Sequence, residues 1–192
     1  MTQKGFFFNQ QRCIGCKTCQ MACKDKNNLP LDVWFRRVSS FESGSYPMPT
    51  AYHYSASCNH CSKPECVAVC PIGAAHVDIE DGTVQIDSSI CIGCQYCVTA
   101  CPYGNPRYLM DRMVVQKCDA CKTWREDGEH IACVSACPMR ALEFRPLDEL
   151  KAAHPEAIDV LPILPDPTKT SPSLLINAKQ SALLPDYREM HY

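Results

Sequence analysis

Short apolar stretches, each followed by a cysteine-rich loop, set the pattern of this chain. Phe6–Phe8 and the alternating segment Thr83–Asp87 predict two short strands. Beyond the loop that follows each of them, Gln20–Ala22 and Gln95–Ala100 suit short helices. The pattern therefore predicts a repeated unit of strand, cysteine loop and short helix.

Two regions without cysteine carry further elements. Val33–Val38 and Ala51–Tyr54 predict two strands around a turn at Gly44–Pro49. Leu147–Ala153 predicts a helix after the last cysteine. Residues 146–192 hold seven of the fifteen prolines. Such a segment builds little core, so we expect it to run extended over a surface and regard it as a candidate for wrapping a partner.

The apolar stretches are too short for a membrane or an export signal. No segment approaches the roughly 18 apolar residues that cross a bilayer, and the aromatic run at 6–8 is shorter than the apolar part of a secretory signal. Arg36-Arg37 is not followed by an apolar segment. We therefore expect a soluble chain that a partner brings to any membrane it serves, which leaves the compartment open.

Sixteen cysteines in 192 residues form four groups of four, with none left over. Groups one and three share the spacing C-x2-C-x2-C-x3-C, whereas groups two and four carry longer second gaps. Proline follows groups two, three and four. This is an internal repeat with loop insertions. The groups are Cys13, Cys16, Cys19, Cys23; Cys58, Cys61, Cys66, Cys70; Cys91, Cys94, Cys97, Cys101; and Cys118, Cys121, Cys133, Cys137.

This spacing is typical of cubane iron–sulfur chemistry. Each iron of such a cluster needs one protein ligand besides its bridging sulfides, and a single tight loop supplies three thiolates. In the bacterial ferredoxin pattern the fourth cysteine ligates the other cluster of a pair. Gly93 permits the tight loop at Cys91–Cys94. Four groups therefore predict four [4Fe–4S] clusters in two modules.

The short separation of groups two and three indicates which groups exchange ligands. Twenty residues separate Cys70 from Cys91, whereas 34 separate Cys23 from Cys58. We therefore expect group two to pair with three, and one with four; pairing one with two and three with four remains the alternative. The expected ligand sets are site 1, Cys13, Cys16, Cys19 and Cys137; site 2, Cys58, Cys61, Cys66 and Cys101; site 3, Cys91, Cys94, Cys97 and Cys70; and site 4, Cys118, Cys121, Cys133 and Cys23.

Other uses of the cysteines fit less well. Disulfides would accord with an even number of cysteines, but no export signal is visible. Zinc is an alternative for group four, whose spacing suits a tetrahedral thiolate site. No three cysteines show the C-x3-C-x2-C spacing of radical enzymes. Clusters with four ligands leave no vacancy for catalysis at iron, so the function expected is one-electron transfer along a row of clusters.

A few polar residues near the cysteines allow two interpretations. Lys17, Lys117, Lys122 and Gln95 adjoin ligands and could raise cluster potentials, or be solvated surface residues. His60 lies inside group two, where a structural hydrogen bond is favoured over a role in proton movement.

The charge excludes one class of partner. The chain has 19 basic and 21 acidic residues, a formal net charge of −2. Four oxidised clusters with their thiolates would bring this to about −10, since each adds roughly −2. Nucleic acid, which needs a basic face, is therefore a poor candidate partner.

Across residues 5–150 the sequence resembles the iron–sulfur electron-transfer subunits of molybdopterin oxidoreductases, above all the subunit of dimethyl sulfoxide reductase. The residues that carry the resemblance are Arg12–Asp25, Trp34–Val38, Ser57–Cys61, Cys91–Gly104, Cys133–Pro138 and Arg140–Phe144. The resemblance implies a molybdopterin catalytic partner containing molybdenum or tungsten, and a quinol-oxidising membrane anchor. Some relatives replace one ligand of group three by Trp and hold a [3Fe–4S] cluster; this chain has cysteine at all four positions.

We therefore expect an α+β fold of two ferredoxin-like 2[4Fe–4S] modules, each a pseudo-twofold βαβ repeat, with inserted strands. The expected segments are one module at 1–28 with 105–150, a β insert at 29–57, the second module at 58–104, and an extended Pro-rich tail at 151–192. By itself such a chain is not an enzyme. A mobile multi-cluster ferredoxin is the alternative function, and a structural or assembly protein with zinc in some sites is a third.

Overall fold

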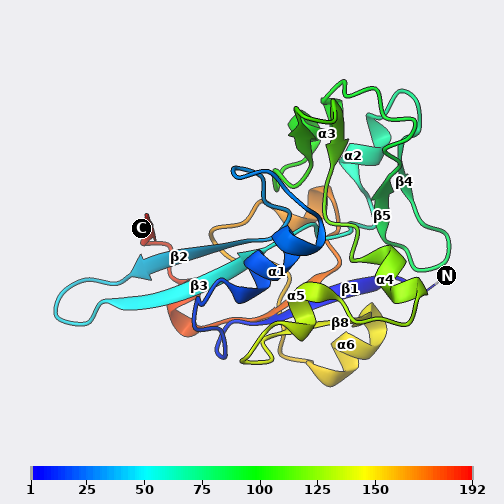
Figure 1. The fold of residues 1–192 in the computed structure, drawn as a ribbon. Helices are drawn as coiled ribbons and strands as arrows, with labels where there is room; N and C mark the ends of the chain where they lie inside the picture. Colours follow the sequence, from blue (N-terminus) through cyan, green and yellow to red (C-terminus); the bar gives the residue numbers. More distant parts are fainter. Residues whose placement is uncertain (1, 192) are drawn as a thin grey trace.

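A three-stranded sheet lies at the centre of the larger lobe in the computed structural model, which describes residues 2–191 (Figure 1). Strand β1 (Lys4–Asn9) pairs antiparallel with β8 (Leu142–Pro146) and parallel with β9 (Leu174–Asn177). Phe6, Phe7 and Phe8 are all at most 2% exposed, because both faces of β1 are covered. The predicted strand at 6–8 is confirmed, and its unbroken aromatic run reflects burial on two sides.

Helices cover the two faces of this sheet. On one face α1 (Thr18–Lys26) packs against the short helix α5 (Ala132–Ser135). On the other, α6 (Leu147–Ala153) buries Leu150 against Phe7. The helices predicted at Gln20–Ala22 and Leu147–Ala153 are confirmed.

The second lobe holds two small hairpins and two short helices (Figure 1). Its elements are α2 (Glu65–Ala68), β4 (Ala75–Val77), β5 (Val84–Ile86), α3 (Tyr96–Ala100), β6 (Arg107–Leu109) and β7 (Val114–Gln116). The predicted strand near Thr83–Asp87 and the helix near Gln95–Ala100 correspond to β5 and α3. Val115 of β7 packs with Val84 and Cys97. Residues 107–116 thus pack in this lobe, although the expected division assigned 105–150 to the other module.

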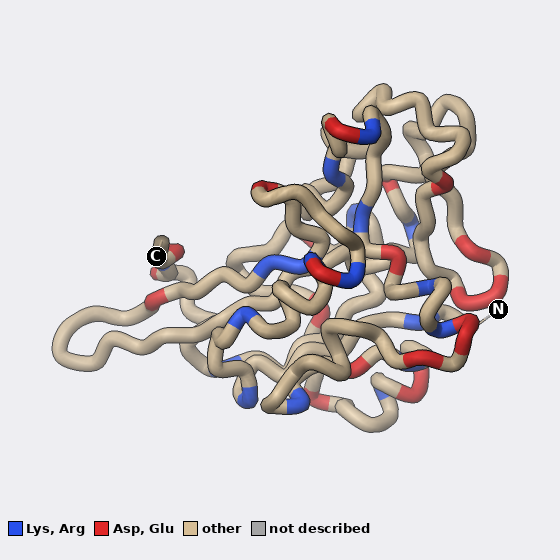
Figure 2. Tube along the Cα trace, viewed as in Figure 1, with Lys and Arg blue, Asp and Glu red and all other residues tan. Residues whose placement is uncertain are grey.

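A long antiparallel hairpin projects from the body of the molecule (Figure 1). It consists of β2 (Arg37–Ser43) and β3 (Thr50–Ala56), and β10 (Tyr187–Met190) pairs with β2. The tip carries no charged residue (Figure 2).

The first strand of this hairpin begins at Arg37, so the prediction of a strand from Val33 was wrong in its start. Residues 33–36 instead bend around Lys24. The ammonium group of Lys24 lies 4.1 Å from the ring centre of Trp34 and donates to the carbonyls of Leu31 and Val33. A cation held by several carbonyls favours an irregular loop over a paired strand.

The segment 151–192 differs from the expected tail with little core. Strands β9 and β10 come from it, and so do the short 3-10 helices at Pro167–Lys169 and Gln180–Leu183. Leu161, Ile176 and Ala182 are at most 1% exposed. Apart from Pro167, which begins a 3-10 helix, the prolines of this segment lie in the connections. The short apolar run at 174–176 forms a strand because β1 offers it a free edge.

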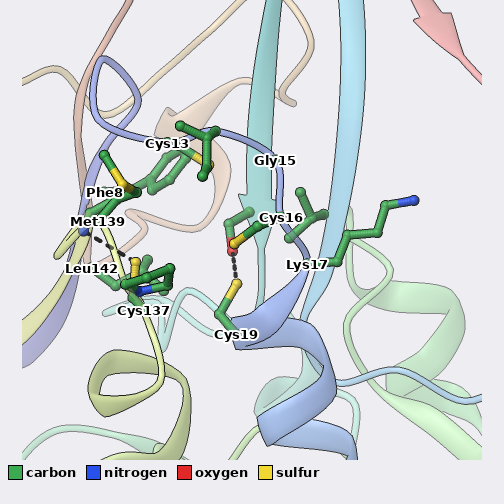
Figure 3. A pocket seen from close by; sticks show the side chains of 14 residues that line it. Phe8, Cys13, Gly15, Cys16, Lys17, Cys19, Cys137, Met139 and Leu142 are labelled. Atoms are coloured by element: carbon green, nitrogen blue, oxygen red, sulfur yellow. Dashed lines mark hydrogen bonds between the residues drawn. The ribbon is translucent and has the colours of Figure 1, made fainter.

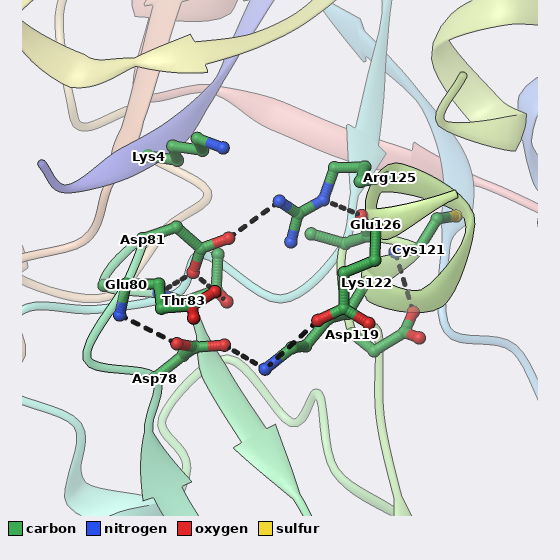
Figure 4. Close-up of polar contacts among 12 residues, drawn as sticks. Lys4, Asp78, Glu80, Asp81, Thr83, Asp119, Cys121, Lys122, Arg125 and Glu126 are labelled. Atoms are coloured by element: carbon green, nitrogen blue, oxygen red, sulfur yellow. Dashed lines mark hydrogen bonds and ion pairs between the residues drawn. The ribbon is translucent and has the colours of Figure 1, made fainter. Parts of the chain in front are cut away.

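A buried polar cluster joins the two lobes (Figure 4). Asp81, in the turn after β4, pairs with Arg125 of α4 (Lys122–Glu126) at 2.7 Å. Asp78 of the same turn pairs with Lys122. The carbonyl of Asp81 also accepts a bond of 2.8 Å from the backbone N–H of Lys4. Because these ion pairs hold α4, they fix the cysteine loop that precedes it.

Between residues 2 and 191, every helix is too short or too polar to span a bilayer.

Candidate metal centres

At site 1, residues of the first and the last cysteine group meet. One small cavity is lined by Cys13, Cys16 and Cys19 together with Cys137, so the structure brings the four expected residues together (Figure 3). The loop is tight at Gly15, whose φ is +69° and whose missing Cβ would lie 2.6 Å from the ring of His53. A glycine is therefore required at this position.

Hydrogen-bond donors surround the sulfurs at site 1, and the backbone N–H of Gly15 is directed at Cys13. The hydroxyl of Thr18 donates to Cys16 Sγ at 3.3 Å, and Ser55 Oγ lies 3.5 Å from Cys19 Sγ. The backbone N–H of Ala141 donates to Cys137 Sγ at 3.3 Å. Donors of this kind stabilise negative charge on sulfur.

Site 2 forms a second cavity, in the other lobe. Its wall contains Cys58, Cys61 and Cys66 together with Cys101 from the neighbouring loop. Burial raises the pKa of Cys61 to about 11 and that of Cys66 to about 12. Without a metal, these thiols hold their protons at neutral pH; a bound metal ion would displace them.

The four cysteines expected at site 4 lie in the interior. Cys23, Cys118, Cys121 and Cys133 are each at most 7% exposed. Burial, followed by the nearby charge of Cys133, raises the pKa of Cys23 to about 12. Burial and then Cys23 raise the pKa of Cys118 well above its ordinary value. These interactions place the group-one cysteine Cys23 among the group-four cysteines.

Site 3 lies nearest the surface. Burial, followed by the charges of Cys91, Cys94 and Cys70, raises the pKa of Cys97 to about 11. Backbone N–H groups of Ala75 and Val115 donate to Cys70 Sγ and Cys91 Sγ, both at 3.4 Å. Cys94 itself is exposed.

At sites 1 and 2 the cysteines line cavities. Within residues 2–191, no group of three or more His, Cys, Asp or Glu side chains is arranged to hold a single metal ion. Cavities lined by four cysteines, with N–H and O–H donors directed at the sulfurs, fit a polynuclear cluster.

Comparison with known proteins agrees with this chemistry. The family model "4Fe-4S dicluster domain" matches residues 50–147, and "4Fe-4S binding domain" matches residues 4–25. The B subunit of anaerobic dimethyl sulfoxide reductase from Escherichia coli is 44% identical over 183 residues, 91% of this chain and 88% of that protein. Its counterpart in Haemophilus influenzae is 42% identical over 193 residues, 96% of this chain and 93% of that protein. The chain belongs to the family of dimethyl sulfoxide reductase iron–sulfur subunits.

A thiosulfate reductase electron transfer subunit of Salmonella typhi is also similar, with 44% identity over 147 residues, 73% of this chain and 74% of that protein. The family relationship makes this iron–sulfur subunit a non-catalytic electron-transfer chain.

The polar residues that adjoin the cysteines of this iron–sulfur subunit lie in different environments. Lys17 and Gln95 are exposed, and Lys122 pairs with Asp78. Lys117 is 5% exposed and lines the cavity of site 2. Its ammonium group donates to the backbone carbonyls of Val84 and Cys118. Of these residues, Lys117 is the buried cation.

His60 lies within the core near site 2. It is 0% exposed, and its Nδ1 accepts a bond of 3.1 Å from the backbone N–H of Val84. Burial lowers the pKa of His60 well below its ordinary value. A neutral imidazole that accepts from the backbone has a structural role, the role that sequence reasoning favoured.

Sequence reasoning missed Arg36 and Ser55. In the sequence, Arg36 is part of a family motif and of a basic pair that is not an export signal, yet its side chain is only 2% exposed. Burial distinguishes Arg36 from the exposed Arg37. The sequence of two adjacent arginines does not indicate which of the two side chains points inward.

Proposed function

We propose that this subunit carries four [4Fe–4S] clusters and relays single electrons between a molybdopterin catalytic subunit and a membrane quinone-linked or other redox partner. The composition of the cavities at sites 1 and 2 carries the proposal. Each is lined by three cysteines of one loop and a fourth from another loop, which is the exchange that paired ferredoxin clusters require.

We propose sites 1 to 4, as defined above, as the ligand sets. At site 4, the electrostatic interactions of Cys23 with Cys133 and Cys121 support the set. At site 3, those of Cys97 with Cys91, Cys94 and Cys70 do the same. Paired in this way, group one exchanges with group four and group two with group three.

Neighbouring cysteines support an arrangement of the sites in a row. Cys19 of site 1 is close enough to Cys133 of site 4 for their charges to interact. Cys118 of site 4 interacts in the same way with Cys58 of site 2. Cys66 of site 2 and Cys97 of site 3 belong to one core cluster. The proposed order of electron transfer is therefore 1–4–2–3, in either direction.

The two ends of this row reach the surface. Cys16 of site 1 and Cys94 of site 3 are exposed. Apolar side chains beside them are also exposed, with Ile14 at 58% and Ile92 at 65%. An apolar rim around an accessible ligand suits contact with a redox partner, so one partner is proposed at each end.

When bound, the clusters supply the one-electron chemistry. The protein excludes water by burying the ligands, directs N–H and O–H groups at the sulfurs, and holds neighbouring sites close. The resulting potentials depend on those hydrogen bonds and on local charge.

Metal analysis of anaerobically purified protein tests the proposal. We expect about sixteen iron and sixteen sulfide per chain, from four cubanes, and four one-electron signals in a redox titration by electron paramagnetic resonance. Colourless protein, or protein that holds zinc alone, would refute it. Co-purification with a tagged catalytic subunit tests the partner; a monomer that exchanges electrons with several enzymes would instead indicate a mobile carrier.

A further inference from the structure

Arg36 is a buried cation without a carboxylate partner among residues 2–191. Its side chain is 2% exposed. The guanidinium donates to Ser55 O at 3.1 Å, to Ser55 Oγ at 3.0 Å and to Ser57 Oγ at 2.8 Å. Its Nε–H, also buried, has no hydrogen-bond partner in the described chain. Because its acceptors are neutral oxygens and one N–H has no acceptor, the positive charge of Arg36 is not compensated by these contacts. A buried uncompensated charge is costly in free energy unless negative charge lies nearby.

Cysteines of two sites would supply that negative charge as thiolate ligands of their clusters. Burial alone would lower the pKa of Arg36, yet the charges of Cys133, Cys19, Cys118 and Cys23 raise it above its ordinary value. Cys19 belongs to site 1 and the other three belong to site 4. The ring of Phe6 lies beside it, with its centre 4.9 Å from the guanidinium carbon, and the side chain of Tyr54 is close enough to interact with its charge. Arg36 therefore lies between the two sites and faces both.

Ser55 connects Arg36 to a ligand sulfur. Its hydroxyl accepts from Arg36 and lies 3.5 Å from Cys19 Sγ. A hydroxyl has one proton to donate. Because the guanidinium occupies a lone pair of Ser55 Oγ, the hydroxyl proton is free to point at the sulfur. The arginine thus orients the serine as a donor to site 1.

We propose that Arg36 is a positioning residue which supplies the counter-charge shared by the clusters of sites 1 and 4 and directs the Ser55 hydroxyl at Cys19, so that it raises the reduction potential of both clusters. The inference rests on the proposed function. Reduction adds one negative charge to a cluster. The electron is donated by a neighbouring cluster or redox partner and is later passed on to another. A buried cation stabilises the reduced form more than the oxidised one.

The test compares Arg36→Gln with Arg37→Gln in the cluster-containing full chain. Both substitutions remove one positive charge, but Arg37 is exposed and pairs with Glu189. Redox titration followed by electron paramagnetic resonance gives the reduced-to-oxidised ratio of each cluster. We expect Arg36→Gln to lower this ratio at least tenfold at sites 1 and 4, or about 59 mV for a one-electron couple. Arg37→Gln should stay within about twofold of the wild type.

Two further variants separate charge from hydrogen bonding and from folding. Arg36→Lys keeps the charge and should keep both potentials near the wild-type values. Ser55→Ala removes the donor to Cys19 and should lower the potential of site 1 alone. If the Arg36→Gln chain loses iron, the inference requires that the iron is lost from sites 1 and 4 and retained at sites 2 and 3. It also requires that Arg36→Lys holds iron at all four sites.

Unchanged potentials in an iron-replete Arg36→Gln chain would overturn the inference, and so would loss of all four clusters in both Arg36 variants, which would indicate a role in folding alone. Wild-type protein that lacks clusters at sites 1 and 4 would instead refute the proposed function.

Discussion

Cys137 and Cys13 line the same cavity, although one belongs to the last cysteine group and the other to the first. The strands beside their loops bring them together, since β1 precedes Cys13, β8 follows Cys137, and the two strands pair antiparallel from Lys4 to Phe8. The first and the last cysteine groups, which are the farthest apart in the sequence, thus line one candidate metal site.

Substitution of the exchanged cysteine distinguishes this arrangement from a site built within one group. We expect Cys137→Ser to remove or alter the cluster at site 1 and to leave the signal of site 4 intact. Cys23→Ser should have the opposite effect. Iron analysis and electron paramagnetic resonance of both variants measure this. Loss of the group-four cluster in Cys137→Ser would show that each group keeps its own fourth cysteine.

Lys117 provides a separate test of charge at site 2. Lys117→Gln removes a buried cation from the cavity wall, so we expect the reduced-to-oxidised ratio of that cluster to fall several-fold in a redox titration. Lys63→Gln is the matched control, because Lys63 lies in the loop that carries Cys61 and Cys66 of site 2 but is exposed. Equal shifts in both variants would mean that overall charge, and not the buried position, sets the potential.

Gly15 should tolerate no side chain. In Gly15→Ala the new Cβ would lie 2.6 Å from the His53 ring at a φ of +69°, so both strain and a clash disturb the loop of site 1. Gly128→Ala has the strain alone, because its φ is +78° and nothing lies within 4 Å. We expect about 1–2 kcal/mol of destabilisation from strain in each variant, and loss of iron from site 1 in Gly15→Ala. Equal iron contents would contradict the clash.

Ile176 tests whether segment 151–192 is part of the core. This side chain is 0% exposed and pairs in register with Phe8. Ile176→Ala should cost about 2–5 kcal/mol and lower the temperature at which the cluster absorbance bleaches. Val160→Ala, at a site 38% exposed, should have a small effect. Truncation of 151–192 would therefore damage the fold itself, so it cannot by itself show that this segment wraps a partner.

We expect the Asp81–Arg125 ion pair to make a contribution to the free energy of unfolding that does not change with pH above pH 5. Burial tends to raise the pKa of Asp81, but hydrogen bonds from Thr83 and Arg125 outweigh it, so the pKa lies below the ordinary value of 3.8. A lowered carboxyl pKa gives stability that is complete above the unfolded pKa and is lost as the pH falls through the folded one. Asp81→Asn should therefore lower the bleaching temperature equally at pH 5.5 and pH 8. A smaller effect at pH 5.5 would contradict a lowered pKa.

The repeating local pattern determined a large part of this protein. Four cysteines lie within eleven residues in Cys13–Cys23. The first three of them can bind three irons of one cluster from a single loop, and this capacity does not depend on how the rest of the chain folds. The strand at Phe6–Phe8 and the helix at Leu147–Ala153 were also predictable from the sequence, because an unbroken aromatic run and a helical period are local signals. The spacing alone therefore predicted the kind of cofactor, and the motifs identified the family.

The tertiary structure decided what depends on contacts between distant segments. The strand at Leu174–Asn177 exists because β1 offers it an edge, a property that no local pattern reports. The inward direction of Arg36, beside the outward Arg37, follows from the bend around Lys24 and from the hydroxyls of Ser55 and Ser57. Residue type and spacing fix which ligands a loop can offer, whereas burial and charge at each sulfur arise only when remote parts of the chain pack together.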